Sequence, residues 1–326
     1  MRRAVEFYTA RSSTVNLCAI DISKAFDRMN HHGLFLKLMQ KQVPVNLLCV
    51  IENWFNTCMT CVRWCSTFSD TYCLLRGIRQ GGVLSPYLFA LYINDIIRGV
   101  EEQNVGCTIG FVPICIILYA DDILLLAPSV NALQLLLHTC EVELRKLDLY
   151  INSAKSVCIR IGRRFCNSCQ NLVTIDGHLL IWANSIRYLG VYILAARSFQ
   201  CSFDVAKRKF YSAFNAIYGR IGRFASEEVT LNLISTKCIP CLLYASEALP
   251  LSSAQLKSLN FSAKRVLFKI FKTASPDIIT DCQEFFNFPD VSELILKRKT
   301  NFLNRLSINN NMLCKVLYST FDSTTN

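Results

Sequence analysis

The sequence lacks the features of a secreted chain, and it contains no repeat and no low-complexity segment. Arg2 and Arg3 are followed by Glu6 and polar residues, so no apolar h-region of a signal peptide is present there. The seventeen cysteines are scattered without the spacing of a disulfide framework. We therefore expect free thiols in a reducing compartment, and an intracellular protein of the nucleus, the cytoplasm or both that is not secreted.

Acidic residues are few relative to basic ones, with 24 Asp and Glu against 35 Lys and Arg and a formal net charge of +11. This excess favours a polyanionic partner, although a positive charge also serves plain solubility. The hydrophobic content of 52% excludes a disordered chain. A length of 326 residues is enough for one large domain or two modest ones with a sizeable core.

The most informative segment is Tyr119-Ala120-Asp121-Asp122, in the middle of an apolar run from Ile114 to Ala127. A membrane span over residues 109–128 is disfavoured, because a central aspartate costs roughly 2.5–3.5 kcal/mol on insertion scales and this run has two. A hairpin of two buried strands with the aspartates at its turn fits better. Buried carboxylates need compensation of their charge, and Mg²⁺ or Mn²⁺ is the usual source. A charged hairpin tip without chemistry is the alternative.

A second acidic segment lies upstream, where residues 17–22 form a short apolar strand pattern that ends near Asp21. Between the two acidic segments, residues 76–86 form a basic, glycine-rich loop that leads into a helix starting near Pro86. Carboxylates on two strands beside a flexible basic loop suit a site that holds both metal and phosphate.

Two further patterns could suggest metal sites. Cys166 and Cys169 have the spacing of a metal knuckle, and Cys58, Cys61 and Cys65 lie close in sequence. A closed zinc site needs four ligands, so structural or surface thiols are favoured for both groups. For His31 and His32, near a predicted helix start, we expect polar surface or capping roles.

Taken in order, five blocks of sequence resemble the reverse transcriptase domain of non-LTR (LINE-type) retrotransposons. They are Asp21-(x4)-Phe26, Arg79-Gln80-Gly81-Gly82-Val83-Leu84-Ser85-Pro86, Tyr119-Ala120-Asp121-Asp122, Leu149-Tyr150-Ile151-Asn152-(x2)-Lys155-Ser156 and Arg187-Tyr188-Leu189-Gly190-Val191-Tyr192-Ile193. A lone block of four residues would be weak support, whereas five blocks in the family's order are highly specific. Group II intron-type and telomerase-like enzymes are the neighbouring alternatives within the same class.

The resemblance implies an α+β fold with a right-hand polymerase architecture. We expect a palm with a ferredoxin-like mixed sheet and helices, together with a remnant of fingers, over residues 1–195, and a helical thumb-like region over residues 196–326. The strands that carry the first and third blocks should lie side by side. From local patterns we also expect an irregular lead-in over residues 1–16, and paired strands at Thr60–Arg63 and Tyr72–Leu75. The helices expected after residue 200 cover Asp204–Arg223, Glu227–Cys238, Ala254–Lys272 and Val291–Leu306.

The same resemblance implies an RNA-directed DNA polymerase that extends a DNA primer on an RNA template with dNTP. Asp21 and Asp121 would bridge two Mg²⁺ or Mn²⁺ ions, and Asp122 would support this cluster. Lys155 matches the lysine that protonates or stabilises pyrophosphate. The implied substrate-binding residues are Phe26, as an aromatic gate against a 2′-hydroxyl, with Gln80, Gly81 and Tyr119. A solvated Lys155 and a Phe26 that only fills the core are the corresponding alternatives.

Basic residues of the thumb-like region would contact the template–primer backbone: Lys207, Arg208, Lys209, Arg220, Arg223, Lys264, Arg265, Lys269 and Lys272. About twenty residues precede Asp21, which leaves little for the fingers, and no endonuclease segment is recognised. We therefore expect part of a larger polyprotein with an endonuclease domain, and no membrane partner. A catalytically inactive, nucleic-acid-binding remnant of the same fold is the alternative function.

Overall fold

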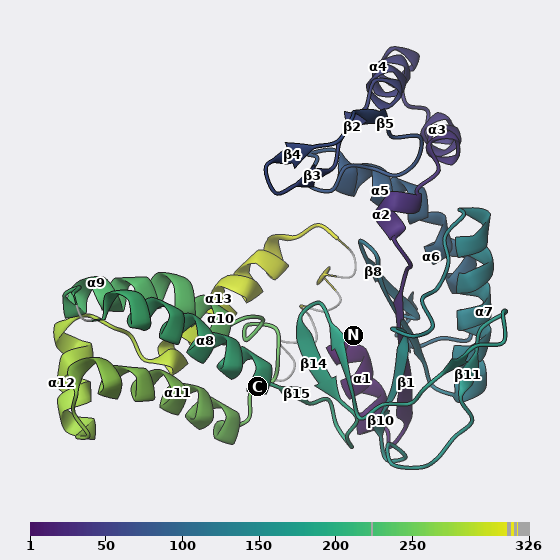
Figure 1. Ribbon diagram of the computed structural model, residues 1–326. Helices are drawn as coiled ribbons and strands as arrows, with labels where there is room; N and C mark the ends of the chain where they lie inside the picture. The colour runs from purple at the N-terminus through teal and green to yellow at the C-terminus, as the bar shows by residue number, and fades with distance from the viewer. Residues whose placement is uncertain (223, 312–313, 316–317, 319–326) are drawn as a thin grey trace. The chain divides into compact units, whose positions relative to one another are not determined.

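The computed structural model describes residues 1–222, 224–311, 314–315 and 318, and divides into two compact units (Figure 1). The first unit comprises Met1–Leu189 and Leu194–Phe199, and the second comprises Gly190–Ile193 and Gln200–Asn326. The first contains the main β-sheet, and the second is mostly helical.

The first unit is built on a four-stranded antiparallel sheet with the strand order β10-β1-β9-β8. Its strands are β1 (Thr14–Asp21), β8 (Ile116–Tyr119), β9 (Asp122–Ala127) and β10 (Val157–Gly162). In chain order these are the first to fourth strands, so the spatial order is 4-1-3-2. That order, with helices between the first and second strands and between the third and fourth, is the ferredoxin-like arrangement expected for the palm.

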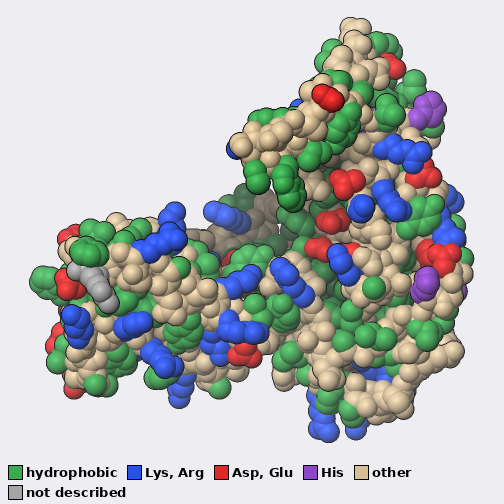
Figure 2. All heavy atoms as spheres, viewed as in Figure 1, with side chains coloured by type: hydrophobic (Ala, Val, Ile, Leu, Met, Phe, Trp, Pro, Cys, Tyr) green, Lys and Arg blue, Asp and Glu red, His purple; other side chains and the backbone are tan. Residues whose placement is uncertain are grey.

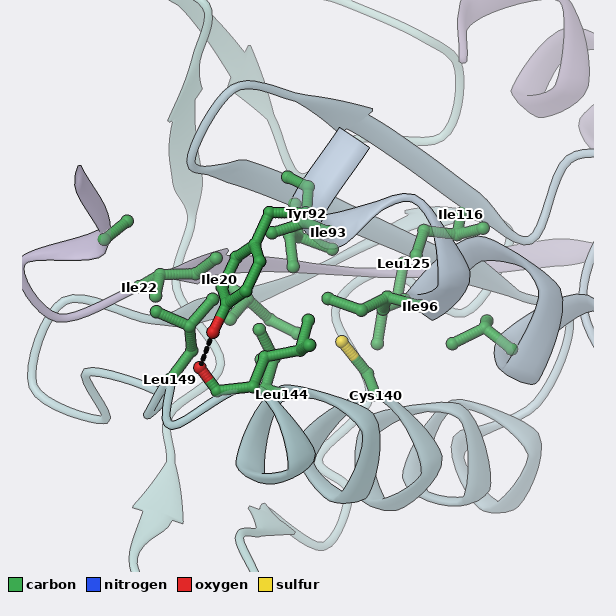
Figure 3. Packing of buried hydrophobic residues seen from close by; sticks show 14 of the residues in the cluster. Ile20, Ile22, Tyr92, Ile93, Ile96, Ile116, Leu125, Cys140, Leu144 and Leu149 are labelled. Atoms are coloured by element: carbon green, nitrogen blue, oxygen red, sulfur yellow. Dashed lines mark hydrogen bonds between the residues drawn. The ribbon is translucent and has the colours of Figure 1, made fainter. Parts of the chain in front are cut away.

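Helices bury one face of this sheet: α5 (Ser85–Ile93), α6 (Asp95–Glu101) and α7 (Val130–Lys146). Figure 3 shows Ile20, Ile96 and Leu144 meeting between the sheet and these helices. The buried Tyr92 hydroxyl donates a hydrogen bond to the carbonyl oxygen of Leu147 at 2.7 Å, so its one polar atom is satisfied. The apolar run from Ile114 to Ala127 therefore forms core strands. In the described part of the chain, no helix combines the length and apolar character that a membrane crossing requires.

The expectation of an irregular lead-in over residues 1–16 was wrong, because helix α1 spans Arg2–Ala10 and β1 begins at Thr14. Ala4 and Val5 on α1 are fully buried. Only two residues of the helix are buried, so the apolar stripe was too short to be recognised from the sequence.

Residues 25–73 form a small helical and hairpin region. It contains α2 (Ala25–Arg28), α3 (His31–Gln40), α4 (Val45–Asn56), β2 (Met59–Thr60), β3 (Arg63–Trp64), β4 (Thr67–Phe68) and β5 (Tyr72–Cys73). Thr60 pairs with Tyr72 as expected, but Arg63 pairs with Phe68 in a separate hairpin. The prediction of one continuous strand pair was wrong here because Cys65, with φ of 54°, reverses the chain directly after Trp64.

Short strands complete the first unit: β6 (Thr108–Ile109), β7 (Val112–Pro113), β11 (Leu172–Val173), β12 (Leu179–Leu180) and β13 (Ser185–Tyr188). Side chains of α7 hold the β11–β12 hairpin. Gln134 hydrogen-bonds both backbone groups of Val173, and the buried Glu141 accepts from the backbone N–H of Ile175.

The second unit contains strands β14 (Val191–Leu194, of which Leu194 belongs to the first unit) and β15 (Cys201–Ser202), followed by helices. The helices are α8 (Asp204–Ile221), α9 (Glu227–Leu233), the π-helix η1 (Ile234–Cys238), α10 (Ile239–Leu242), α11 (Ser253–Phe271), α12 (Pro276–Phe285) and α13 (Val291–Ile308). The four expected helices are present. The expected end of the first, Arg223, lies outside the described residues. The sequence patterns missed α12, which has a single buried residue, Ile279.

Candidate active site

The aspartates of the two acidic segments meet at one end of the sheet. Asp21 is the last residue of β1 and lies directly opposite Asp122, the first residue of β9. Residues opposite each other on antiparallel strands place their side chains on the same face. Tyr119 pairs with Asp122, so Ala120 and Asp121 form the two-residue turn, with Ala120 at φ of 52°. The structure thus confirms the expected hairpin, and its strand β9 lies next to β1 as expected.

Negative charge is concentrated at this end of the sheet. Partial burial raises the pKa of Asp122, and the charges of Asp121 and Asp21 raise it further. The exposed Arg187 on β13 acts in the opposite direction and lowers the pKa. Like charges this close favour any cation that can enter the site. Burial and the charge of Asp122 also raise the pKa of Tyr188, whose hydroxyl donates to the Ile117 carbonyl of β8 at 3.3 Å.

The segment that carries Lys155 is fastened to the end of β1 by hydrogen bonds. The backbone N–H of Asn152 donates to the Asp21 carbonyl at 2.8 Å, and the N–H of Asp21 donates to the Ser156 hydroxyl at 3.1 Å. Next to these bonds, the N–H of Ser23 donates to the Tyr150 carbonyl at 2.9 Å. The Lys155 ammonium consequently lies 4.0 Å from a carboxylate oxygen of Asp21, with 70% of its side chain exposed.

Phe26 lies on α2 and packs on the buried Phe89 of α5, with ring centroids 4.5 Å apart. The backbone N–H of Ile78 donates to the Phe26 carbonyl at 2.9 Å. This bond brings residues 76–85, which we call the Gln80 loop, next to α2.

These segments surround an open cavity of about 520 Å³. It is lined by Asp21, Ile22, Ser23, Lys24, Ala25, Phe26, Arg28, Gln80, Asp121, Asn152 and Lys155. Five of the eight predicted site residues are therefore brought together: Asp21, Phe26, Gln80, Asp121 and Lys155. The other three do not line the cavity, namely Asp122, Gly81 and the 65% exposed Tyr119. Figure 2 shows acidic and basic side chains gathered beside one another on this face of the first unit.

Sequence reasoning missed Arg28 and Asn152 as cavity residues. Asn152 lies in the same sequence block as Lys155, and this position was the only indication in the sequence that it lines the cavity. Arg28 lies over the Tyr150 ring at 5.3 Å, a contact that no local pattern predicts. Lys24, for which the sequence left a surface and a phosphate-facing role open, lines the cavity and has φ of 50°.

No three His, Cys, Asp or Glu side chains in the described ranges are grouped so that they already form a metal site. The donor chemistry of the cavity nevertheless fits a hard cation, because carboxylate oxygens of Asp21 and Asp121 face one solvent-open space. Cys58, Cys61, Cys65, Cys166 and Cys169 are all free thiols.

The expectation of a polar surface or capping role was wrong for His31. Its ring is half-buried against Phe55, with centroids 4.4 Å apart, and the helix cap is Asn30 instead. His32 is exposed, as expected.

Comparisons with known proteins agree with the geometry. Residues 5–193 match the family of reverse transcriptases (RNA-dependent DNA polymerases). The chain is 29% identical over 240 residues to the Pol polyprotein of the type-1 retrotransposable element R2 of Popillia japonica, covering 71% of this chain and 33% of that protein. It is 24% identical over 311 residues to the RNA-directed DNA polymerase of the mobile element jockey of Drosophila funebris, covering 92% of this chain and 33% of that protein. The chain thus spans about a third of the length of these two relatives.

A solved telomerase from Candida albicans shares the fold, with a TM-score of 0.52 and 12% identity over 88% of this chain and 52% of that one. The relatives confirm the resemblance to non-LTR retrotransposon polymerases. Because the matched segment covers more than half of the 326 residues and contains the whole acidic cavity, the chain belongs to the reverse transcriptase (RNA-dependent DNA polymerase) family.

Proposed function

We propose that this chain carries the nucleotidyl-transfer site of a retrotransposon RNA-directed DNA polymerase, which extends a DNA primer on an RNA template with dNTP. The observation that carries the proposal is the pairing of Asp21 with Asp122 across β1 and β9, with Asp121 at the adjoining turn. Asp21 and Asp121 line one cavity together with Phe26, Gln80 and Lys155.

In this site Asp21 and Asp121 would hold two Mg²⁺ or Mn²⁺ ions, with Asp122 beside them. When bound, such a pair of ions activates the attacking hydroxyl and neutralises charge on the triphosphate. The negative charges of Asp21 and Asp121 raise the pKa of Asp122, and a cation bound between these carboxylates would relieve their mutual repulsion.

The remaining cavity residues would position the nucleotide. The Phe26 ring, held on Phe89, would lie under the sugar and exclude a 2′-hydroxyl. Lys155, 4.0 Å from Asp21, would place its ammonium near the leaving pyrophosphate and donate a proton there. Gln80 and the exposed Gly81 and Tyr119 would contact the nucleotide or the template at the rim.

Exposed basic residues of the second unit would bind the nucleic-acid backbone without sequence preference. Arg208, Lys209, Arg220, Arg265, Lys269 and Lys272 are exposed. Lys207 is engaged by Asp204 at 2.9 Å, which leaves it less available for phosphate. Arg223 lies outside the described residues. That this chain is part of a larger polyprotein with an endonuclease domain stays a prediction.

The test is primer extension on an RNA template with Mg²⁺, measured for the purified chain and for Asp121→Asn. Asp70→Asn is the matched control, because Asp70 is exposed and does not line the cavity. Template–primer affinity is measured in parallel by fluorescence anisotropy.

We expect Asp121→Asn to abolish extension and to leave template–primer affinity nearly unchanged, while Asp70→Asn behaves as the wild type. Equal extension by Asp121→Asn and the wild-type chain would refute the assignment. Tight template–primer binding without extension by the wild type would instead support the inactive nucleic-acid-binding remnant.

A further inference from the structure

His31 occupies the first position of α3, directly after the cap residue Asn30. The Asn30 side chain accepts from the backbone N–H groups of His32 and Gly33, so the helix start is satisfied without the imidazole. The His31 ring packs on Phe55 of α4, and its Nε2 lies 2.6 Å from the carbonyl oxygen of Gly77. A carbonyl can only accept, so the imidazole carries its proton on Nε2.

Gly77 begins the stretch of the Gln80 loop that contacts α2. Its N–H donates to the Met29 carbonyl at 2.8 Å, and the next N–H, of Ile78, donates to the Phe26 carbonyl. His31, at the start of α3, adds a third hydrogen bond to Gly77 and Ile78, and among the described residues it is the only one of the three made by a side chain. It can therefore be removed by substitution while the backbone bonds are kept.

The downstream half of the loop is held separately. The Ser85 hydroxyl donates to the Arg79 carbonyl at 2.6 Å, and the Arg79 guanidinium donates to the Met59 carbonyl. Gln80 directly follows Arg79, is exposed, and lines the same cavity as Asp21. The position of Gln80 in the cavity thus depends on the anchored residues Gly77, Ile78 and Arg79 that come directly before it.

We propose that His31 is a positioning residue for nucleotide binding: its Nε2 bond to Gly77 fixes the Gln80 loop against the start of α3 and so holds Gln80 beside the Asp21 cavity. This inference rests on the proposed function for the meaning of that cavity. The His31 contact itself does not depend on it.

Two substitutions separate the hydrogen bond from the packing. His31→Phe keeps an aromatic ring on Phe55 and removes the donor, whereas His31→Gln removes the ring and keeps an amide donor at a similar reach. His32→Phe is the matched control, because His32 is the exposed neighbour on the same helix turn. Circular dichroism establishes that each variant is folded.

Trypsin reads the loop directly, because Arg76 and Arg79 are exposed residues within it. Losing one hydrogen bond should raise cleavage after these arginines by about fivefold in His31→Phe, as expected for a neutral bond of ordinary strength. His31→Gln and His32→Phe should stay within about twofold of the wild type.

Nucleotide binding is measured without catalysis, as the concentration of dNTP, in the presence of Mg²⁺, at which the rate of trypsin cleavage in the loop falls to half. His31→Phe should raise this concentration by about fivefold, and His31→Gln should restore it, while template–primer affinity stays unchanged. Equal loop cleavage in His31→Phe and the wild type would refute the inference, as would faster cleavage with unaltered dNTP protection. A wild-type chain that neither extends primers nor gains protection from dNTP would refute the proposed function. The trypsin cleavage rates would in that case still test whether the His31–Gly77 hydrogen bond holds the loop.

Discussion

Replacement of Gly77 by alanine should destabilise the first unit more than the same change at Gly81. Both glycines belong to the Gln80 loop and both have positive φ, at 80° and 87°. They differ in their surroundings. A Cβ at Gly77 would lie 2.7 Å from the Asp27 carbonyl oxygen and 2.8 Å from that of Phe26, whereas a Cβ at Gly81 meets nothing within 4 Å.

The left-handed backbone costs an alanine about 1–2 kcal/mol at either position. Alanine also restricts the unfolded chain more than glycine does, which offsets about 0.4–1 kcal/mol of that cost, by the same amount at both positions. The overlap with α2 arises only at Gly77, where the obstacle is rigid backbone, and such overpacking costs about 1–3 kcal/mol. The free energy of unfolding should therefore fall by about 1–3 kcal/mol more in Gly77→Ala than in Gly81→Ala.

Urea unfolding followed by tryptophan fluorescence measures this difference, because Trp54, Trp64 and Trp182 all lie in the first unit. The comparison requires similar m-values in both variants. Equal free energies of unfolding for Gly77→Ala and Gly81→Ala would show that the loop does not contact α2 in solution. That result would also remove the structural basis for the His31 inference.

Three further outcomes are expected. The pKa of Asp122 is raised in the folded chain, so the folded state holds its proton to higher pH and stability falls as pH rises from the ordinary aspartate pKa through the raised one. Asp122→Asn should remove that fall and raise the urea midpoint at pH 7, and an unchanged or lower midpoint would contradict the charge cluster. Phe26→Ala should lower the ratio of dNTP to rNTP incorporation, since the ring on Phe89 no longer fills the sugar site. A constant ratio would make Phe26 a core residue only. Template–primer affinity should fall steeply with salt, and Arg208→Gln, which removes an exposed cation, should make the slope of log K against log salt shallower by about 0.9. An identical slope would mean that Arg208 contacts no phosphate.

The sequence was sufficient for the acidic hairpin and the strand that carries Asp21. These segments are apolar on both faces, bounded by turn residues, and lie in an order that identifies the family. It failed at α1 and α12, whose buried residues number two and one. Short elements with so little apolar surface are stabilised by their neighbours, and a local pattern does not contain the neighbours.

The sequence likewise identified some of the residues that line the cavity and missed others. Asp21 and Asp121 were recognisable because carboxylates inside apolar strands are unusual. Arg28 was not, because its place depends on a ring 122 positions later in the chain, at Tyr150. His31 was misjudged for a similar reason, since its partner Gly77 is 46 positions away.

Because β1 lies between β10 and β9 in the sheet, it cannot complete its strand pairing until both of these strands have been synthesised. Thr14 pairs with Gly162, and Asp21 pairs with Asp122, so both partners of β1 are made long after it. At ribosomal rates of about 5–20 residues/s, β1 waits roughly 7–28 s for its second neighbour. Until β9 is made, Leu17 and Ile20, which end almost fully buried, have no neighbouring strand to pair with. The strand that carries Asp21 is thus the part of the first unit with the longest exposure to mispairing, and its folding is a natural point of dependence on chaperones.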